Sequence, residues 1–140
     1  MAKPFLEIQG LTKRIGHRVL FENISFTVNE REHIGLIAKN GTGKSTLLSI
    51  IAGQEGNDGG KMIFRNDLKV GYLEQTPHID GHKLAGLDDE YLQRYKQLLT
   101  QMKITPEEAE RPEAQLSGGQ VKRIALARVL AGEPDMLILD

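Results

Sequence analysis

A glycine-rich segment between an apolar run and a helix-forming run carries the residues best suited to phosphate chemistry. The segment reads Ala38-Lys39-Asn40-Gly41-Thr42-Gly43-Lys44-Ser45-Thr46. Its glycines let successive backbone N–H groups point at phosphate oxygens, and a helix beginning near Gly43 adds unpaired N–H groups and a positive dipole end. Lys44 can reach the β- and γ-phosphates, while Ser45 can place its hydroxyl on Mg²⁺. The segment therefore predicts a loop that binds a nucleoside triphosphate.

The glycine-rich segment allows one other interpretation and excludes another. The strict phosphate-loop pattern has glycine at the position of Ala38, so an ordinary strand-to-helix turn with an exposed lysine is one alternative. A dinucleotide fingerprint is excluded, because its third glycine would fall on Thr46.

A second motif, Leu116-Ser117-Gly118-Gly119-Gln120, stands before a predicted helix at residues 121–131. Ser117 can cap this helix, while Gly118 and Gly119 leave backbone N–H groups open, which makes a second anion site. The alternative is a simple helix cap followed by a flexible turn. Beyond the helix, the apolar run at residues 136–139 predicts a buried strand that ends in the carboxylate of Asp140.

With these motifs in this order, the chain resembles the ATP-binding domain of ABC-type ATPases. Residues 38–45 look like Walker A, residues 116–120 match the ABC signature, Asp140 stands at the Walker B aspartate, and Gln75 resembles the Q-loop glutamine. The resemblance implies an α/β P-loop NTPase with a mainly parallel core sheet, flanking antiparallel strands and a short helical subdomain at about residues 76–120. One ABC ATP-binding domain, in its amino-terminal part, would then occupy residues 1–140.

The resemblance also implies roles for the motif residues. The reaction is phosphoryl transfer from ATP to water, with ATP and Mg²⁺ as cofactors. Lys44, Gln75 and Asp140 are the expected catalytic residues, and Ser45, Gln75 and Asp140 the expected metal site. The signature residues Ser117, Gly118, Gly119 and Gln120 would meet nucleotide held by a second ABC ATPase domain, as a homodimer or tandem domain. Without the family pattern, Gln75 is an ordinary solvated glutamine, and an apolar strand ending in aspartate is common in α/β sheets.

Base recognition departs from the family pattern. ABC domains commonly stack an aromatic ring on adenine at the position before the first hairpin glycine, which is Ile15 before Gly16 here. Isoleucine can cover the base but provides no aromatic stacking, so the choice between ATP and GTP stays open.

Several segments indicate which kind of ABC protein this is. Residues 21–26, 71–75 and 116–123 resemble the soluble F subfamily, and within it Uup-like proteins, which implies a ribosome as partner. The alternatives are the ATP-binding subunit of a membrane transporter, and a nucleotide-binding module without turnover. The family pattern continues beyond Asp140 with a glutamate, so we interpret the chain as truncated there, with little or no turnover alone.

Composition sets broad limits. The chain has 140 residues, which suits one domain, and 39% hydrophobic and 26% charged residues, which suits a globular protein. Its net charge of −1 favours neither nucleic acid nor anionic membrane, and it contains no cysteine. Neither a membrane span nor a signal peptide is recognisable, so we expect a cytoplasmic protein without direct membrane insertion.

The secondary-structure pattern completes the predicted fold. Strands are expected at residues 5–8, 23–28, 34–38, 62–64 and 69–73. The phosphate-loop helix should end near Ala52. Asp88 should cap a helix with an apolar face, and Thr105 with Glu108 forms a predicted capping box.

Overall fold

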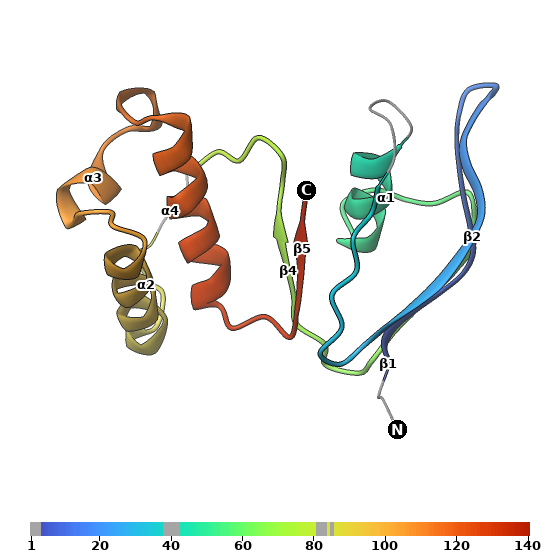
Figure 1. Ribbon diagram of the computed structural model, residues 1–140, viewed down its shortest axis with the longest axis horizontal. Helices are drawn as coiled ribbons and strands as arrows, with labels where there is room; N and C mark the ends of the chain where they lie inside the picture. The colour runs from blue at the N-terminus through green and yellow to red at the C-terminus, as the bar shows by residue number, and fades with distance from the viewer. Residues whose placement is uncertain (1–3, 38–42, 81–83, 85) are drawn as a thin grey trace. The chain divides into compact units, whose positions relative to one another are not determined.

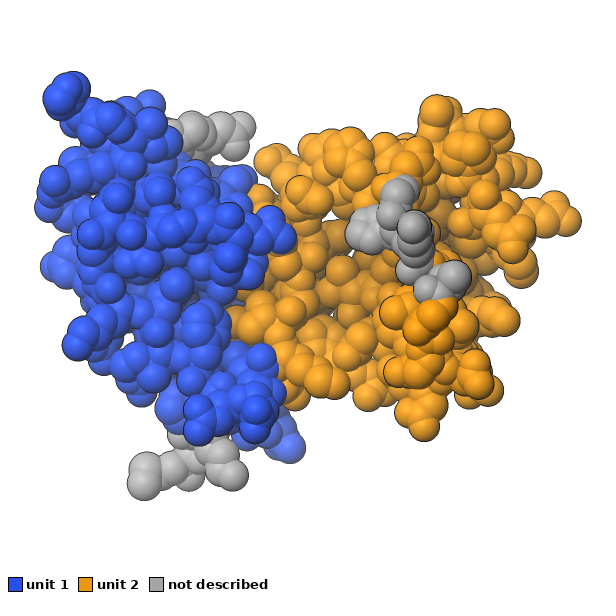
Figure 2. Space-filling view, turned by 180° about the vertical axis from the view of Figure 1, so that it is seen from behind, with its two compact units in different colours: residues 1–68 blue, residues 69–140 orange. Residues whose placement is uncertain are grey.

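The computed structural model describes residues 4–37, 43–80, 84 and 86–140. The chain forms two compact units, residues 1–68 and residues 69–140 (Figure 2). In chain order, the helices and strands are β1 (Pro4–Ile15), β2 (Arg18–Asn29), α1 (Lys44–Ile51), β3 (Gly59–Phe64), β4 (Val70–Leu73), α2 (Asp89–Gln101), α3 (Pro106–Glu110), the 3-10 turn η1 (Glu113–Gln115), α4 (Gly118–Ala131) and β5 (Met136–Leu139) (Figure 1).

The first unit is built on a three-stranded antiparallel sheet in the order β2-β1-β3. β1 and β2 form a long hairpin that pairs from Pro4 with Asn29 to Ile15 with Arg18 (Figure 1). The apolar residues Leu6, Ile8 and Leu11 of the central strand are fully buried. The strands expected at residues 5–8, 23–28 and 62–64 are confirmed, and each lies within a longer strand.

The prediction of a strand at residues 34–38 is wrong for residues 34–37. Residues 34–37 form no strand, and Ile34, Leu36 and Ile37 are exposed, the last at 96%. Ala38 lies outside the described residues. An apolar run forms a buried strand only where neighbouring strands accept its backbone hydrogen bonds and other side chains cover its faces, and the run alone does not provide those neighbours.

The second unit combines a small parallel sheet with a helical core. β4 and β5 pair in parallel, from Val70 with Met136 to Leu73 with Leu139. Helices α2 and α4 lie side by side and α4 also contacts β4 (Figure 1). The buried core of this unit consists of Ile79, Tyr95, Leu99, Ile104, Val121, Ile124, Ala125, Ala127 and Ala131. The α/β fold class with separate parallel and antiparallel sheets is therefore confirmed.

Local capping sets where the helices of this unit begin. Asp88 Oδ1 accepts a hydrogen bond from the Tyr91 N–H at 2.7 Å, as predicted. Thr105 and Glu108 form the predicted capping box at α3. α4 begins at Gly118, earlier than the predicted residue 121, because Ser117 and Gln120 form a second capping box. Within the described ranges, none of the helices combines the length and hydropathy that a bilayer-spanning segment requires.

Candidate nucleotide-binding site

The amino-terminal end of α1 is the first part of the candidate site. Gly43 precedes the helix with φ of +93°, a left-handed conformation that glycine adopts without steric cost. A Cβ at Gly43 would lie 3.4 Å from the Phe21 ring and 3.5 Å from Leu20 Cβ, because β2 passes close by. Lys44 and Ser45 are the first helical residues, as predicted. The other predicted loop residues, Ala38, Lys39, Asn40, Gly41 and Thr42, lie outside the described residues.

This end of α1 is built differently from those of the other α-helices. Gly43 makes no side-chain cap bond and the first turn carries no acidic residue, whereas α2, α3 and α4 each have a side-chain cap among the described residues. Leu47, Ile50 and Ile51 are buried and fix the helix in its unit. Lys44 and Thr46 are half-buried and Ser45 is exposed. The positive end of the helix dipole thus lies beside a lysine, which favours anionic oxygens.

Ile15 lies at the end of β1, where the hairpin turns at Gly16 and His17. Its side chain is 58% exposed and the residue pairs with Arg18. An exposed aliphatic side chain at a hairpin tip can cover one face of a base by contact alone.

Gln75 and Asp140 are brought to one edge of the parallel sheet. Leu73 pairs with Leu139, and the Asp140 N–H donates to the Leu73 carbonyl oxygen at 3.0 Å. Gln75 follows Leu73 by two residues and is exposed, whereas Asp140 is half-buried. The carboxyl ends of neighbouring parallel strands are a common position for ligand-binding residues in α/β proteins.

The signature residues form the amino-terminal end of α4. Gln120 N–H donates to Ser117 Oγ at 3.1 Å, and Ser117 N–H donates to Gln120 Oε1 at 2.8 Å. Val121 N–H donates to the Ser117 carbonyl oxygen at 3.0 Å. Among the described residues, no hydrogen bond is formed by the N–H groups of Gly118 and Gly119. The end of α4 therefore presents two adjacent backbone donors.

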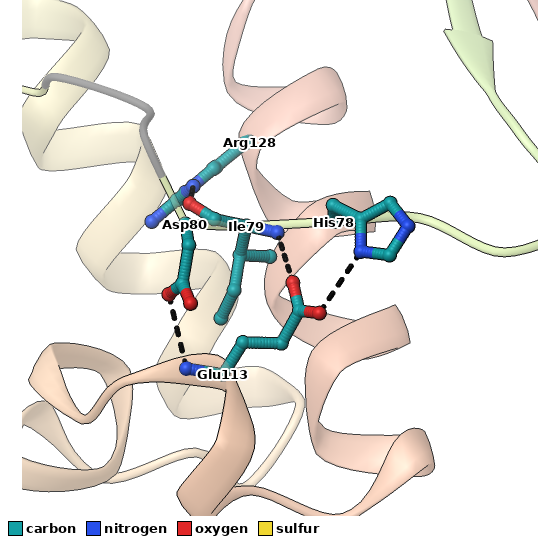
Figure 3. A network of polar contacts seen from close by, with 5 residues as sticks. All are labelled: His78, Ile79, Asp80, Glu113 and Arg128. Carbon is teal, nitrogen blue, oxygen red and sulfur yellow. Dashed lines mark hydrogen bonds and ion pairs between the residues drawn. The ribbon is translucent and has the colours of Figure 1, made fainter.

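A polar network ties the segment after Gln75 to the helices of the second unit (Figure 3). Glu113 accepts hydrogen bonds from the Ile79 N–H at 2.7 Å and contacts His78 Nδ1 at 2.9 Å. Glu113 N–H donates in return to Asp80 Oδ1 at 3.0 Å. Arg128 of α4 donates to the Ile79 carbonyl oxygen at 2.8 Å.

The network also shifts the pKa values of His78 and Glu113. The hydrogen bond with Glu113 raises the pKa of His78 above its usual value, helped by the Glu113 charge. The same hydrogen bond lowers the pKa of Glu113, with the Ile79 N–H as the next cause. Both charged forms are thereby favoured.

Sequence reasoning missed this network. Its members are far apart in the chain, with Ile79 and Arg128 separated by 49 positions. No spacing rule connects such residues. The capping box of α4, in contrast, has a readable signal in the spacing of Ser117 and Gln120.

The chain matches a known protein family. Residues 21–140 match the family description ABC transporter, and the chain belongs to this family. It is an ATP-binding domain of the ABC ATPase type, and ATP hydrolysis is the activity of that family.

The curated relatives include import ATP-binding proteins and a ribosome protection protein. The chain is 36% identical over 143 residues to the zinc import ATP-binding protein ZnuC 1 of Hahella chejuensis, across 98% of this chain and 55% of that protein. It is 34% identical over 151 residues to the ribosome protection protein VmlR of Bacillus subtilis, across 99% of this chain and 26% of that protein. The chain thus spans about half the length of ZnuC 1 and about a quarter of VmlR.

Solved structures share the fold. One is an ATP-binding cassette in a dimeric post-hydrolysis state bound to ADP and Pi, with a TM-score of 0.79 and 24% identity. The match covers 96% of this chain and 73% of that chain.

Proposed function

We propose that the chain binds ATP as part of the ATP-binding subunit of an import transporter. The observation that carries nucleotide binding is the end of α1, where a left-handed Gly43 leads into Lys44 without a side-chain cap or an acidic residue. Such a helix end offers N–H groups and positive potential to phosphates, and Lys44 adds a full charge. The relatives that support the transporter role are import ATP-binding proteins for zinc and for sulfate/thiosulfate.

In this proposal, residues 38–46 hold the phosphates and Ile15 covers the base. Residues 1–140 then form the amino-terminal part of one ABC ATP-binding domain, with a helical subdomain at about residues 76–120. Helices α2 and α3 and the turn η1 fall inside that range and support the assignment.

Mg²⁺ binding would use Ser45, Gln75 and Asp140. A hydroxyl, an amide oxygen and a carboxylate are the hard oxygen ligands that Mg²⁺ prefers. Within the described ranges, no group of three or more His, Cys, Asp or Glu side chains is placed to hold a metal. The ion would therefore depend on phosphate oxygens and water for its remaining ligands, which is usual for Mg²⁺ with nucleotides. The ion supplies charge neutralisation at the phosphates, and Lys44, Gln75 and Asp140 position the reacting groups.

The signature end of α4 would act on nucleotide bound by a second ABC ATPase domain. The two adjacent donors of Gly118 and Gly119, with the Ser117 hydroxyl, suit the terminal oxygens of a triphosphate. ATP would then hold two domains together, and hydrolysis would release them.

The test of nucleotide binding compares two lysine variants by calorimetric titration with Mg-ATP. A charged hydrogen bond to phosphate contributes about 1.5–3 kcal/mol, so Lys44→Ala should weaken binding roughly tenfold to a hundredfold. Lys61→Ala, which removes an exposed lysine of the same unit, should bind like the wild type. Equal affinities for both folded variants would refute the assignment.

A ribosome-associated function of the F subfamily is the second candidate. It is supported by the similarity to VmlR and by the F-type sequence segments around the Q-loop and signature. Purification of the tagged, complete gene product from its native host distinguishes the transporter role from the ribosome-associated role. Co-purification with an integral membrane protein would support the transporter role, and ATP-dependent sedimentation with ribosomes would support the second candidate.

A further inference from the structure

Glu108 connects the capped ends of two helices. Its Oε1 accepts a hydrogen bond from the Thr105 N–H at 3.2 Å, and its own N–H donates to Thr105 Oγ1 at 3.1 Å. Its second oxygen, Oε2, accepts a hydrogen bond from Gln120 Nε2. The carboxylate that completes the capping box of α3 therefore also contacts the side chain that completes the capping box of α4.

This contact determines which way the Gln120 amide faces. Ser117 N–H is a donor and requires the amide oxygen, whereas the Glu108 carboxylate is an acceptor and requires the amide NH₂. Only one orientation of Gln120 satisfies both neighbours. The Glu108 carboxylate orients the Gln120 amide more strongly than a neutral acceptor would, because hydrogen bonds to ionised groups are stronger than those between neutral groups.

The charge on Glu108 is itself stabilised. Hydrogen bonding with Thr105, first through the side chain and then through the backbone, lowers the pKa of Glu108, and the bond from Gln120 adds to this. The acceptor that orients Gln120 is therefore ionised at neutral pH.

The orientation of Gln120 in turn sets the donors of α4. Ser117 N–H is occupied by Gln120 Oε1, and Gln120 N–H is occupied by Ser117 Oγ. The backbone donors left at this end are those of Gly118 and Gly119. If Gln120 lost its orientation, its amide could turn its NH₂ toward Ser117 N–H, and the fixed pattern of donors would be lost.

We propose that Glu108 is a positioning residue for the signature: through Gln120 it holds the end of α4 in the form that presents Gly118 and Gly119 to a phosphate. The inference rests on the proposed function of the signature in pairing with a second domain. In this proposal Glu108 acts on the signature through Gln120.

Three variants distinguish the positioning role of Glu108 from general effects of charge or stability. Glu108→Gln keeps an oxygen for Thr105 N–H but presents NH₂ to the NH₂ of Gln120, so the cap of α3 survives and the link is lost. Glu107→Gln removes the same charge from the same helical turn and serves as the control, because its exposed side chain has no part in the link. The double change Glu108→Gln with Gln120→Glu exchanges the two groups, so that the amide at position 108 donates to the carboxylate at position 120.

The first measurement is amide hydrogen exchange of Ser117 in the full 140-residue chain, read by nuclear magnetic resonance. Glu108→Gln should accelerate exchange of this N–H about twofold to tenfold, the range expected for one hydrogen bond. Glu107→Gln should leave the rate unchanged, and the exchanged pair should restore it. Wild-type protection in Glu108→Gln, or equal acceleration in Glu107→Gln, would overturn the proposal.

The second measurement is self-association in Mg-ATP, read by sedimentation velocity beside the affinity of the monomer for Mg-ATP. Glu108→Gln should weaken ATP-dependent pairing while single-site affinity stays at the wild-type value, a separation that general destabilisation would not produce. If Glu108→Gln accelerates amide hydrogen exchange of Ser117 but pairs like the wild type, the proposed effect of Glu108 on pairing would be overturned. A wild type that binds ATP but never pairs would instead refute the proposed role of the signature, and Ser117 exchange would still decide whether Glu108 orients Gln120.

Discussion

Gly71 lies in β4 at a point where the strand has no room for a side chain. A Cβ built there would lie 2.7 Å from Val129 Cγ1 and 3.0 Å from Pro134 Cγ. Val129 belongs to α4, and Pro134 lies in the segment between α4 and β5. Gly71→Ala would therefore push β4 away from the helix that carries the signature and from the connection to its parallel partner.

The expected cost follows from this crowding. Overpacking a well-packed contact costs about 1–3 kcal/mol. Val129 and Pro134 have short, stiff side chains, which retreat from a new methyl group less easily than a long flexible side chain would. For a chain of this size the melting temperature should fall by roughly 3–15 °C. The backbone of Gly71 is not left-handed, so the loss comes from crowding and not from φ strain.

Urea unfolding followed by far-UV circular dichroism measures this loss. The signal reports mainly on the second unit, because α2, α3 and α4 all belong to residues 69–140. Gly118→Ala is the matched control in the same unit, since a Cβ there meets nothing within 4 Å. It should stay within about 0.5 kcal/mol of the wild type. A loss below about 0.5 kcal/mol for Gly71→Ala, or an equal loss for both variants, would refute the reasoning.

Three further predictions concern the second unit. The contact between His78 and Glu113 should stabilise the unit most between pH 4.5 and pH 6.5, which are the ordinary pKa values of the two groups. The contribution of His78 is lost as pH rises through its raised pKa, and the contribution of Glu113 is lost as pH falls through its lowered pKa. Melting temperatures of the wild type and Glu113→Gln across pH should differ most in that window; a constant difference would contradict the assignment. Asp88→Ala should cost about 1 kcal/mol in urea unfolding by removing the cap of α2, and no loss would speak against the cap. Ser117→Arg should leave single-site ATP binding nearly intact by calorimetry but abolish ATP-dependent pairing in sedimentation; a large loss of monomer binding would show that the signature acts within one chain.

The sequence motifs establish the protein family but not the F subfamily. Residues 38–45, 75, 116–120 and 140 indicated an ABC-type ATPase domain, and family membership is confirmed. The finer assignment stays a prediction, since the matched relatives include import proteins as well as a ribosome protection protein. Phosphate chemistry is the same in both kinds of protein, and its motifs do not encode the partner.

Local rules sufficed wherever a residue acts on neighbours within one helical turn. The cap at Asp88, the capping box at Thr105 and the glycine at position 43 were all predictable, because their hydrogen bonds and backbone angles involve residues a few positions away. The order of the motifs likewise needed only the chain.

Tertiary structure decided the features that depend on distant partners. Residues 34–37 have the composition of a buried strand, yet whether they form one depends on neighbours elsewhere in the chain, and here they form none. Glu113 holds His78 across 35 positions, and Glu108 orients Gln120 across 12. Both pairs depend on the packing of separate elements, which brings an acceptor to a donor that no local spacing could have identified.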